Sequence, residues 1–164
     1  ANRKKGPTQK QKSGGKDWGA KIAGDNAPFD PTPWLNYPAV VLFGANHYAS
    51  RLPDSPAWLV WDKRNGGCDF ADCELAWTNY GCAVRKIEHL WNGMLREGKE
   101  QRYHPTQKPL KVMTWCISLC KKAETILDPF MGSASTGVSR LAKARSAACS
   151  TAATCGIVIG RTCD

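Results

Sequence analysis

The chain has 164 residues, 42% of them apolar, which suits one domain with a hydrophobic core and argues against a disordered chain. Its formal net charge of +9 favours a polyanionic partner such as nucleic acid, with a merely basic protein as the alternative. No window approaches the ~20 apolar residues of a membrane span. The eight cysteines do not form a C-x-x-C…C-x-x-C zinc pattern, so we expect packed thiols and no metal. Because the chain shows neither a membrane span nor a signal peptide, we expect reduced thiols and no membrane partner.

The amino-terminal segment differs in composition from the rest. Residues 1–16 hold six Lys or Arg and no acid, which is typical of a flexible basic arm that could touch phosphates. A solvated tail is the alternative interpretation. Because the chain begins at Ala1 and its first methionine is Met94, we expect it to be a piece of a longer protein.

Three short apolar runs predict strands in the first half of the domain. They cover residues 38–44, 57–62 and, more weakly, 73–79. The segment between the first two runs should be a loop with some helical character. Residues 84–103 carry charge and scattered aromatic residues without periodicity, and we expect an exposed loop or subdomain there.

The next part of the chain, from Pro109, alternates helix and strand. Leu110, Met113, Ile117 and Cys120 recur at helical spacing behind Pro109, which is well tolerated at a helix start. Residues 125–128 predict a strand, and a second helix should run from residue 135 to about residue 144. This rhythm is typical of a parallel, doubly wound α/β sheet.

The last segment, residues 146–164, is rich in Ala, Ser, Thr and Cys and is unlike the chain before it. Its "GIVIG" run could form an edge strand. A frameshift after about Arg145 would explain the composition of this atypical tail. The main folded domain is therefore expected to cover residues 17–145.

The turn after the predicted strand at residues 125–128 is the strongest candidate for a binding site. Asp128 ends the strand, and Gly132 lies in the turn that leads to the next helix. An acid at this place could accept a bond from a ligand ammonium, while the helix start favours a carboxylate. A ligand with both groups is an amino acid or a cofactor with an amino-acid end. The alternative is a tight turn with an exposed Asp; P-loop and G-x-G-x-x-G patterns are absent.

Two motifs together resemble a known family. "HPTQKP" followed by "LDPFMGSAST" is similar to the paired motifs of S-adenosylmethionine-dependent DNA amino-methyltransferases, which modify adenine N6 or cytosine N4. The order resembles the permuted, phage- or prophage-type group, and the likeness covers roughly residues 18–141. It implies a Rossmann-like methyltransferase sheet, mostly parallel and here incomplete, in which residues 84–103 form a loop or target-recognition region. It also implies double-stranded DNA as partner and the cytoplasm of a bacterial or phage-infected cell as location.

The resemblance also implies which residues bind the cofactor, S-adenosylmethionine. They come from the hexapeptide and from the strand-end loop: His104, Thr106, Gln107, Lys108, Pro109, Asp128, Phe130, Gly132, Ser133 and Ala134. Ala134 stands where the family usually has Gly. His47 and His89 lie outside these motifs, and we expect them to be surface or loop histidines.

One departure from the family concerns catalysis. The family's motif of Asp, Asn or Ser followed by Pro-Pro and an aromatic residue does not occur in the chain, so the catalytic residues stay unassigned. Two other interpretations therefore stay open beside the methyltransferase, with adenine favoured as its target. One is a catalytically dead DNA-binding remnant, and the other is a different α/β protein that binds an amino-containing ligand through Asp128.

Overall fold

The computed structural model describes residues 27–66, 70–91, 95–103, 107–120, 125–130, 135–141, 146–149 and 156–160. The strands are β1 (Ala39–Phe43), β2 (Trp58–Asp62), β3 (Cys73–Thr78), β4 (Arg85–Glu88), β5 (Thr125–Asp128), β6 (Ser146–Cys149) and β7 (Gly156–Gly160). The helices are α1 (Leu110–Leu119) and α2 (Ser135–Leu141), with short 3-10 turns η1 (Thr32–Trp34), η2 (Ala45–His47) and η3 (Ala49–Arg51). The predicted basic arm, residues 1–16, lies outside the described residues.

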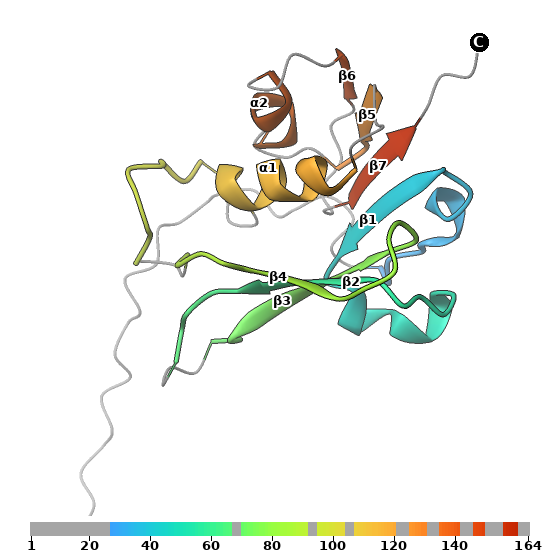
Figure 1. Cartoon of the computed structure of the whole chain (residues 1–164), viewed down its shortest axis with the longest axis horizontal. Helices are drawn as coiled ribbons and strands as arrows, with labels where there is room; N and C mark the ends of the chain where they lie inside the picture. Colours follow the sequence, from blue (N-terminus) through green and yellow to red (C-terminus); the bar gives the residue numbers. More distant parts are fainter. Residues whose placement is uncertain are drawn as a thin grey trace, which may run out of the picture.

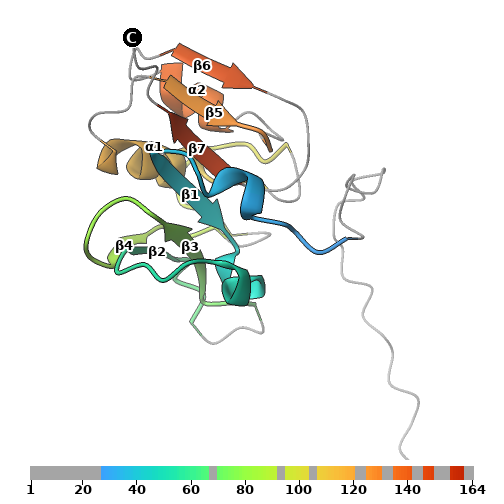
Figure 2. The ribbon, with the colours of Figure 1, turned by 90° about the vertical axis from the view of Figure 1, so that its right-hand side faces the viewer.

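All these strands belong to one sheet in the order β4-β2-β3-β1-β7-β5-β6 (Figures 1 and 2). Only β2–β4 and β5–β6 pair in parallel; the other neighbouring pairs are antiparallel. The sheet with its helices agrees with an α/β fold, but the expected mostly parallel pairing must be corrected to a mixed sheet. Because β3 and β7 each run against both neighbours, the other five described strands still point one way.

Three strands differ from the sequence predictions. The predicted loop at residues 84–103 contains β4, which pairs in parallel with β2 and turns Ile87 toward the core. Strand β6 lies in the segment expected to be an atypical tail. The "GIVIG" run forms β7, which is not an edge strand, since it pairs with β1 on one side and β5 on the other.

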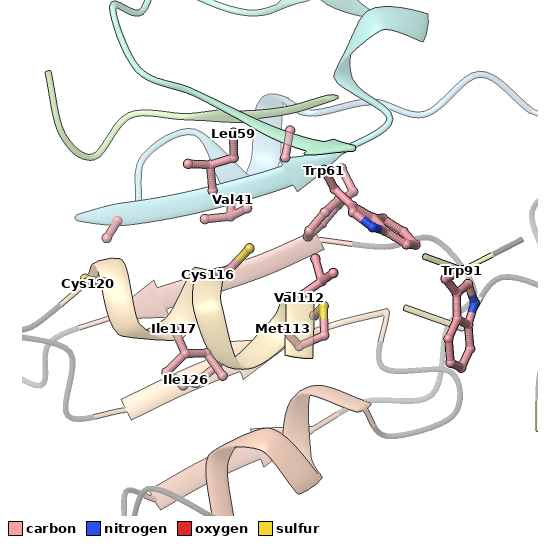
Figure 3. Close-up of a cluster of buried hydrophobic side chains, with 13 residues drawn as sticks. Val41, Leu59, Trp61, Trp91, Val112, Met113, Cys116, Ile117, Cys120 and Ile126 are labelled. Carbon is pink, nitrogen blue, oxygen red and sulfur yellow. The ribbon is translucent and has the colours of Figure 1, made fainter. Parts of the chain in front are cut away.

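The main core lies between the sheet and α1. Helix α1 begins after Pro109, whose carbonyl accepts a hydrogen bond from the Met113 amide at 3.1 Å. Figure 3 shows Ile117 pointing toward Ile126 of β5 while Cys116 points toward Val41 of β1. The buried members of this α1 cluster are Ala39, Val41, Phe43, Leu59, Trp61, Ala76, Trp91, Val112, Met113, Cys116, Ile117, Cys120 and Ile126.

A second apolar cluster covers the opposite face of β1. It contains Val40, Leu42, Ala45, Tyr48 and Trp77, with residues of the segment around η1 packed against it. Every residue of β1 is buried, as expected for a strand enclosed on both faces. The two clusters fix β1, and with it the sheet edge at which β1 and β5 end.

None of the helices in the described ranges has the length and hydropathy needed to cross a membrane.

Candidate cofactor site

The carboxylate of Asp128 is fixed by its own turn. The side chain is buried, with 4% of the residue exposed, at the carboxyl end of β5. Its Oδ1 accepts a hydrogen bond from the Phe130 amide at 2.9 Å, and its Oδ2 accepts one from the Thr136 hydroxyl. Each carboxylate oxygen has two lone pairs, so both can accept one more bond from a ligand. The expected exposed-Asp alternative is therefore wrong about the exposure of this residue.

Burial dominates the acidity of Asp128. It raises the pKa of this carboxyl above its ordinary value of 3.8, although the hydrogen bonds from Thr136 and Phe130 act in the opposite direction. Among the residues that the structure describes, no cationic side chain contributes to the shift. A ligand ammonium placed here would favour the ionised carboxylate, so the site is electrostatically suited to a cation.

Lys108, the lysine of the hexapeptide, is held by Glu74 from β3. The Lys108 Nζ lies 2.9 Å from Glu74 Oε2, and the Nζ of Lys63 lies 2.8 Å from Glu74 Oε1. The three side chains are largely buried, with exposed fractions of 13% for Lys108, 18% for Lys63 and 24% for Glu74. The Lys108 Nζ also lies 5.6 Å from the ring centre of Phe43, the last residue of β1.

Opposing effects set the acidity of Glu74. Burial is the largest single influence and acts to raise the pKa of this carboxyl. The ammonium groups of Lys108 and Lys63 together outweigh it, so the pKa lies below the ordinary value of 4.5. Glu74 is therefore ionised at neutral pH and forms a three-residue charge cluster with net charge +1.

Gln107 uses its whole amide group within the protein. Its Oε1 accepts a hydrogen bond from the Tyr103 amide at 2.7 Å, while its Nε2 donates to Glu100 Oε1 at 3.2 Å and to the Gln101 carbonyl at 3.1 Å. The residue is 8% exposed. In this conformation the Gln107 side chain holds the segment that carries Lys108.

Asp128 and Lys108 lie on the same face of the sheet. Ile126 belongs to the α1 cluster, and Asp128, two residues further along β5, faces the same side because side chains alternate along a strand. Phe43, whose ring faces the Lys108 Nζ, also belongs to the α1 cluster. One strand, β7, separates β1 from β5, so the two strands run about 10 Å apart.

An aromatic cluster adjoins the turn after Asp128. The ring of Phe130 packs edge-on against Phe29 and Trp34, with ring centres 5.5 Å and 5.3 Å apart. Phe29 in turn lies 4.9 Å from the ring of Tyr48, whose hydroxyl donates to the Phe43 carbonyl at 2.7 Å. The turn after β5 is thus linked through aromatic contacts to the end of β1.

The remaining predicted site residues lie outside the described residues: His104, Thr106, Gly132, Ser133 and Ala134. Pro109 is buried directly before α1 and gives that helix its first carbonyl acceptor. Sequence reasoning missed Glu74, Lys63 and Glu100. An acid inside the otherwise apolar run of β3 was the available signal, because an acid is rarely buried without a partner.

His89 lies in the loop after β4, in agreement with the prediction of a surface or loop position, and is buried there, with 4% of the residue exposed. Its Nδ1 lies 3.3 Å from Glu97 Oε2, and its ring stacks near Trp91 with 6.3 Å between ring centres. His47, at the end of η2, is exposed as expected.

Comparison with known proteins agrees with these features. A family model described as DNA methylase, of the N6/N4 type, matches residues 46–157, which is more than half of the chain. No curated protein and no solved structure matches the chain. The matched range contains β2, β3, β4, the hexapeptide and the Asp128 turn. The chain therefore belongs to the DNA methylase family that includes enzymes acting on adenine N6 or cytosine N4.

Proposed function

We propose that the chain binds S-adenosylmethionine and takes part in methyl transfer to an exocyclic amine in double-stranded DNA, with adenine N6 favoured over cytosine N4. The observation that carries the proposal is the position of Asp128. It is a buried carboxylate at a strand end, with no cationic partner among the described residues, on the sheet face that also holds Lys108. A ligand with an amino-acid end supplies the missing cation.

The residues fit such a ligand chemically. Asp128 has lone pairs left to accept bonds from an ammonium, and Phe130 provides an aromatic wall in the turn beside it. Lys108 lies over Phe43 at the end of β1, and β7 separates that strand from β5. Pockets for small ligands in open α/β sheets lie at the carboxyl ends of strands, and both Asp128 and Phe43 are strand-end residues.

The cofactor supplies an activated methyl group on a sulfonium. In the transfer, a bond forms between the methyl carbon and the base nitrogen while the carbon–sulfur bond breaks, and the amine loses one proton. S-adenosylhomocysteine leaves with the electron pair of the broken bond. Positioning the two reactants in line accounts for most of what such a reaction requires, so the protein's task is to hold the cofactor rigidly. The target base would be flipped out of the duplex.

Calorimetry with S-adenosylmethionine tests the binding step. The Asp128→Asn variant keeps the shape of the side chain and an acceptor for the Phe130 amide but removes the charge. We expect its affinity to fall by about tenfold to a hundredfold, the scale of one charge-assisted hydrogen bond. Asp54→Asn is the matched control, because Asp54 is exposed in the loop before β2. Wild-type protein without measurable binding would contradict the proposal.

A second experiment tests the reaction and its target. Unmethylated duplex DNA is incubated with isotopically labelled S-adenosylmethionine and the protein, and the nucleosides are separated by mass. Label in N6-methyladenine supports the favoured target, and label in N4-methylcytosine moves the proposal to cytosine. Absence of label, together with DNA binding that weakens steeply with salt, favours the DNA-binding remnant, for which the net charge of +9 is the specific argument.

A further inference from the structure

We propose that Glu74 is a positioning residue for the cofactor site, and that it acts by fixing the ammonium group of Lys108. The inference rests on the proposed function, since Lys108 matters only if the site binds S-adenosylmethionine. Glu74 is in neither motif, and its place in the fold alone brings it to the site.

The sheet explains how Glu74 reaches two lysines at once. Strand β3 lies between β2 and β1, and Glu74 is level with Trp61 near the end of β2. Lys63 follows β2 directly, with its Nζ 5.1 Å from the Trp61 ring centre. Lys108 precedes α1 and reaches the same carboxylate from the other side. One carboxylate therefore joins three segments at the sheet edge where β1 and β2 end.

Each oxygen of Glu74 serves a different lysine. Oε2 holds Lys108 at 2.9 Å and Oε1 holds Lys63 at 2.8 Å, so the carboxylate binds both ammonium groups at once. Lys108 is further confined by the ring of Phe43. With 13% of the Lys108 side chain exposed, the cluster is shielded from the screening that weakens surface ion pairs.

Fixing Lys108 in advance favours binding. A lysine side chain without a partner rotates about four bonds. A ligand that orders it on binding is bound more weakly, because the side chain loses conformational entropy. In the wild-type protein Glu74 has already ordered the side chain, so its stem forms a preformed wall of the site. Removal of the Glu74 charge should therefore weaken cofactor binding, even though it makes the site more positive.

The test compares cofactor affinity in the wild-type chain, Glu74→Gln and Lys108→Met by calorimetry. We expect each variant to bind S-adenosylmethionine about threefold to tenfold more weakly, the scale of one immobilised side chain. The double variant should lose no more than either single variant, because the two residues act as one unit. Glu88→Gln is the matched control: it breaks an ion pair of 2.8 Å with Lys86, but that pair is more than half exposed.

A second measurement reports on Lys108 without cofactor. Acetic anhydride labels accessible lysine amines, and mass spectrometry gives the rate for each site. Glu74→Gln should raise the labelling rate of Lys108 severalfold while the labelling rate of the exposed Lys99 stays unchanged. If Glu74 does not hold Lys108 in place, the labelling rate of Lys108 should be the same in the variant and the wild type. Urea unfolding confirms that the variants are folded, and Lys108→Met carries the test if Glu74→Gln is not.

The outcomes separate the two proposals. Wild-type protein that fails to bind S-adenosylmethionine overturns the proposed function. Wild-type binding with unchanged affinity in Glu74→Gln overturns the positioning role alone. Tighter, more salt-dependent binding in Glu74→Gln also overturns it, because that result means the Lys108 ammonium contacts the cofactor directly and Glu74 competes with it.

Discussion

Glu100 and Gln107 are joined by a hydrogen bond of 3.2 Å, and the same Glu100 carboxylate accepts the amide of Leu110, at 3.0 Å from Oε2. The acid thus caps the first turn of α1 while it holds the segment that precedes Lys108. A carboxylate at a helix start stabilises both the free amide groups and the positive end of the helix dipole. Two acids distant in sequence, Glu100 and Glu74, therefore fix the two sides of this segment.

Removal of the Glu100 cap should destabilise the fold. Glu100→Ala leaves the Leu110 amide and one bond of Gln107 without their acceptor, and we expect the free energy of unfolding in urea to fall by about 1–2 kcal/mol. Glu88→Ala, on the exposed side of β4, should change it by less than about 0.5 kcal/mol. Equal effects of the two substitutions would show that Glu100 is not a cap.

The α1 cluster should be sensitive to truncation at Ile117. This side chain is fully buried against Ile126, and Ile117→Ala should lower the free energy of unfolding by about 2–5 kcal/mol through lost contacts and a cavity. Val138 of α2 is 48% exposed, so Val138→Ala should cost less than about 0.5 kcal/mol. Urea unfolding measures both, and an Ile117→Ala protein as stable as the wild type would contradict the described packing.

Glu74 predicts how stability changes in acid. Its pKa is lower in the folded protein than the ordinary 4.5, so the folded state favours the ionised form. Its contribution is complete above pH 4.5 and is lost as the pH falls through the folded-state pKa. The difference in unfolding free energy between the wild type and Glu74→Gln should therefore shrink on acidification from pH 6. A difference that stays constant to pH 3 would contradict this assignment.

Asp128 predicts the opposite dependence. Burial raises its folded-state pKa above 3.8, so ionisation of this residue costs stability as the pH rises from 3.8 through the folded-state pKa. Asp128→Asn should remove that loss, and its unfolding free energy relative to the wild type should increase over this range. Urea unfolding at a series of pH values measures it. Because its pKa is raised, Asp128 is protonated at a higher pH than an ordinary Asp. Cofactor binding should therefore begin to weaken at that higher pH on acidification.

The bond from Thr136 gives an independent check on Asp128. Thr136→Val keeps the side-chain volume but removes the donor to Asp128 Oδ2, and the unfolding free energy at pH 7 should fall by about 1–3 kcal/mol. The decrease should be smaller at pH 4, where more of the carboxyl is protonated. Thr125→Val, at the half-buried start of β5, is the matched control and should have the smaller effect at both pH values.

Sequence periodicity predicted β1, β2 and β5, which are mainly apolar: β1 buries every residue, and β2 and β5 alternate buried with half-buried residues. It missed β4, whose Arg85, Lys86 and Glu88 are exposed and leave only Ile87 to signal a strand. It also misjudged strand direction, because alternation identifies a strand but does not specify how its neighbours run. The position of β7 between β1 and β5 depends on long-range pairing that no local pattern contains.

The site was predicted in the same uneven way. Asp128 could be identified because an acid that ends an apolar strand before a glycine turn is a local signal. Glu74 could not be paired with Lys108 from sequence, since their contact depends on β3 lying between β1 and β2. The role of Gln107 also required coordinates, because its amide is satisfied by backbone and side-chain groups of its own loop.

The most direct test of the account is a crystal structure of this chain grown with S-adenosylmethionine. The account predicts the ligand ammonium within hydrogen-bonding distance of Asp128, on the sheet face where Lys108 lies over Phe43, with the Lys108–Glu74 contact retained. A ligand bound elsewhere, or one that leaves Asp128 in contact with Thr136 and Phe130 alone, would contradict it.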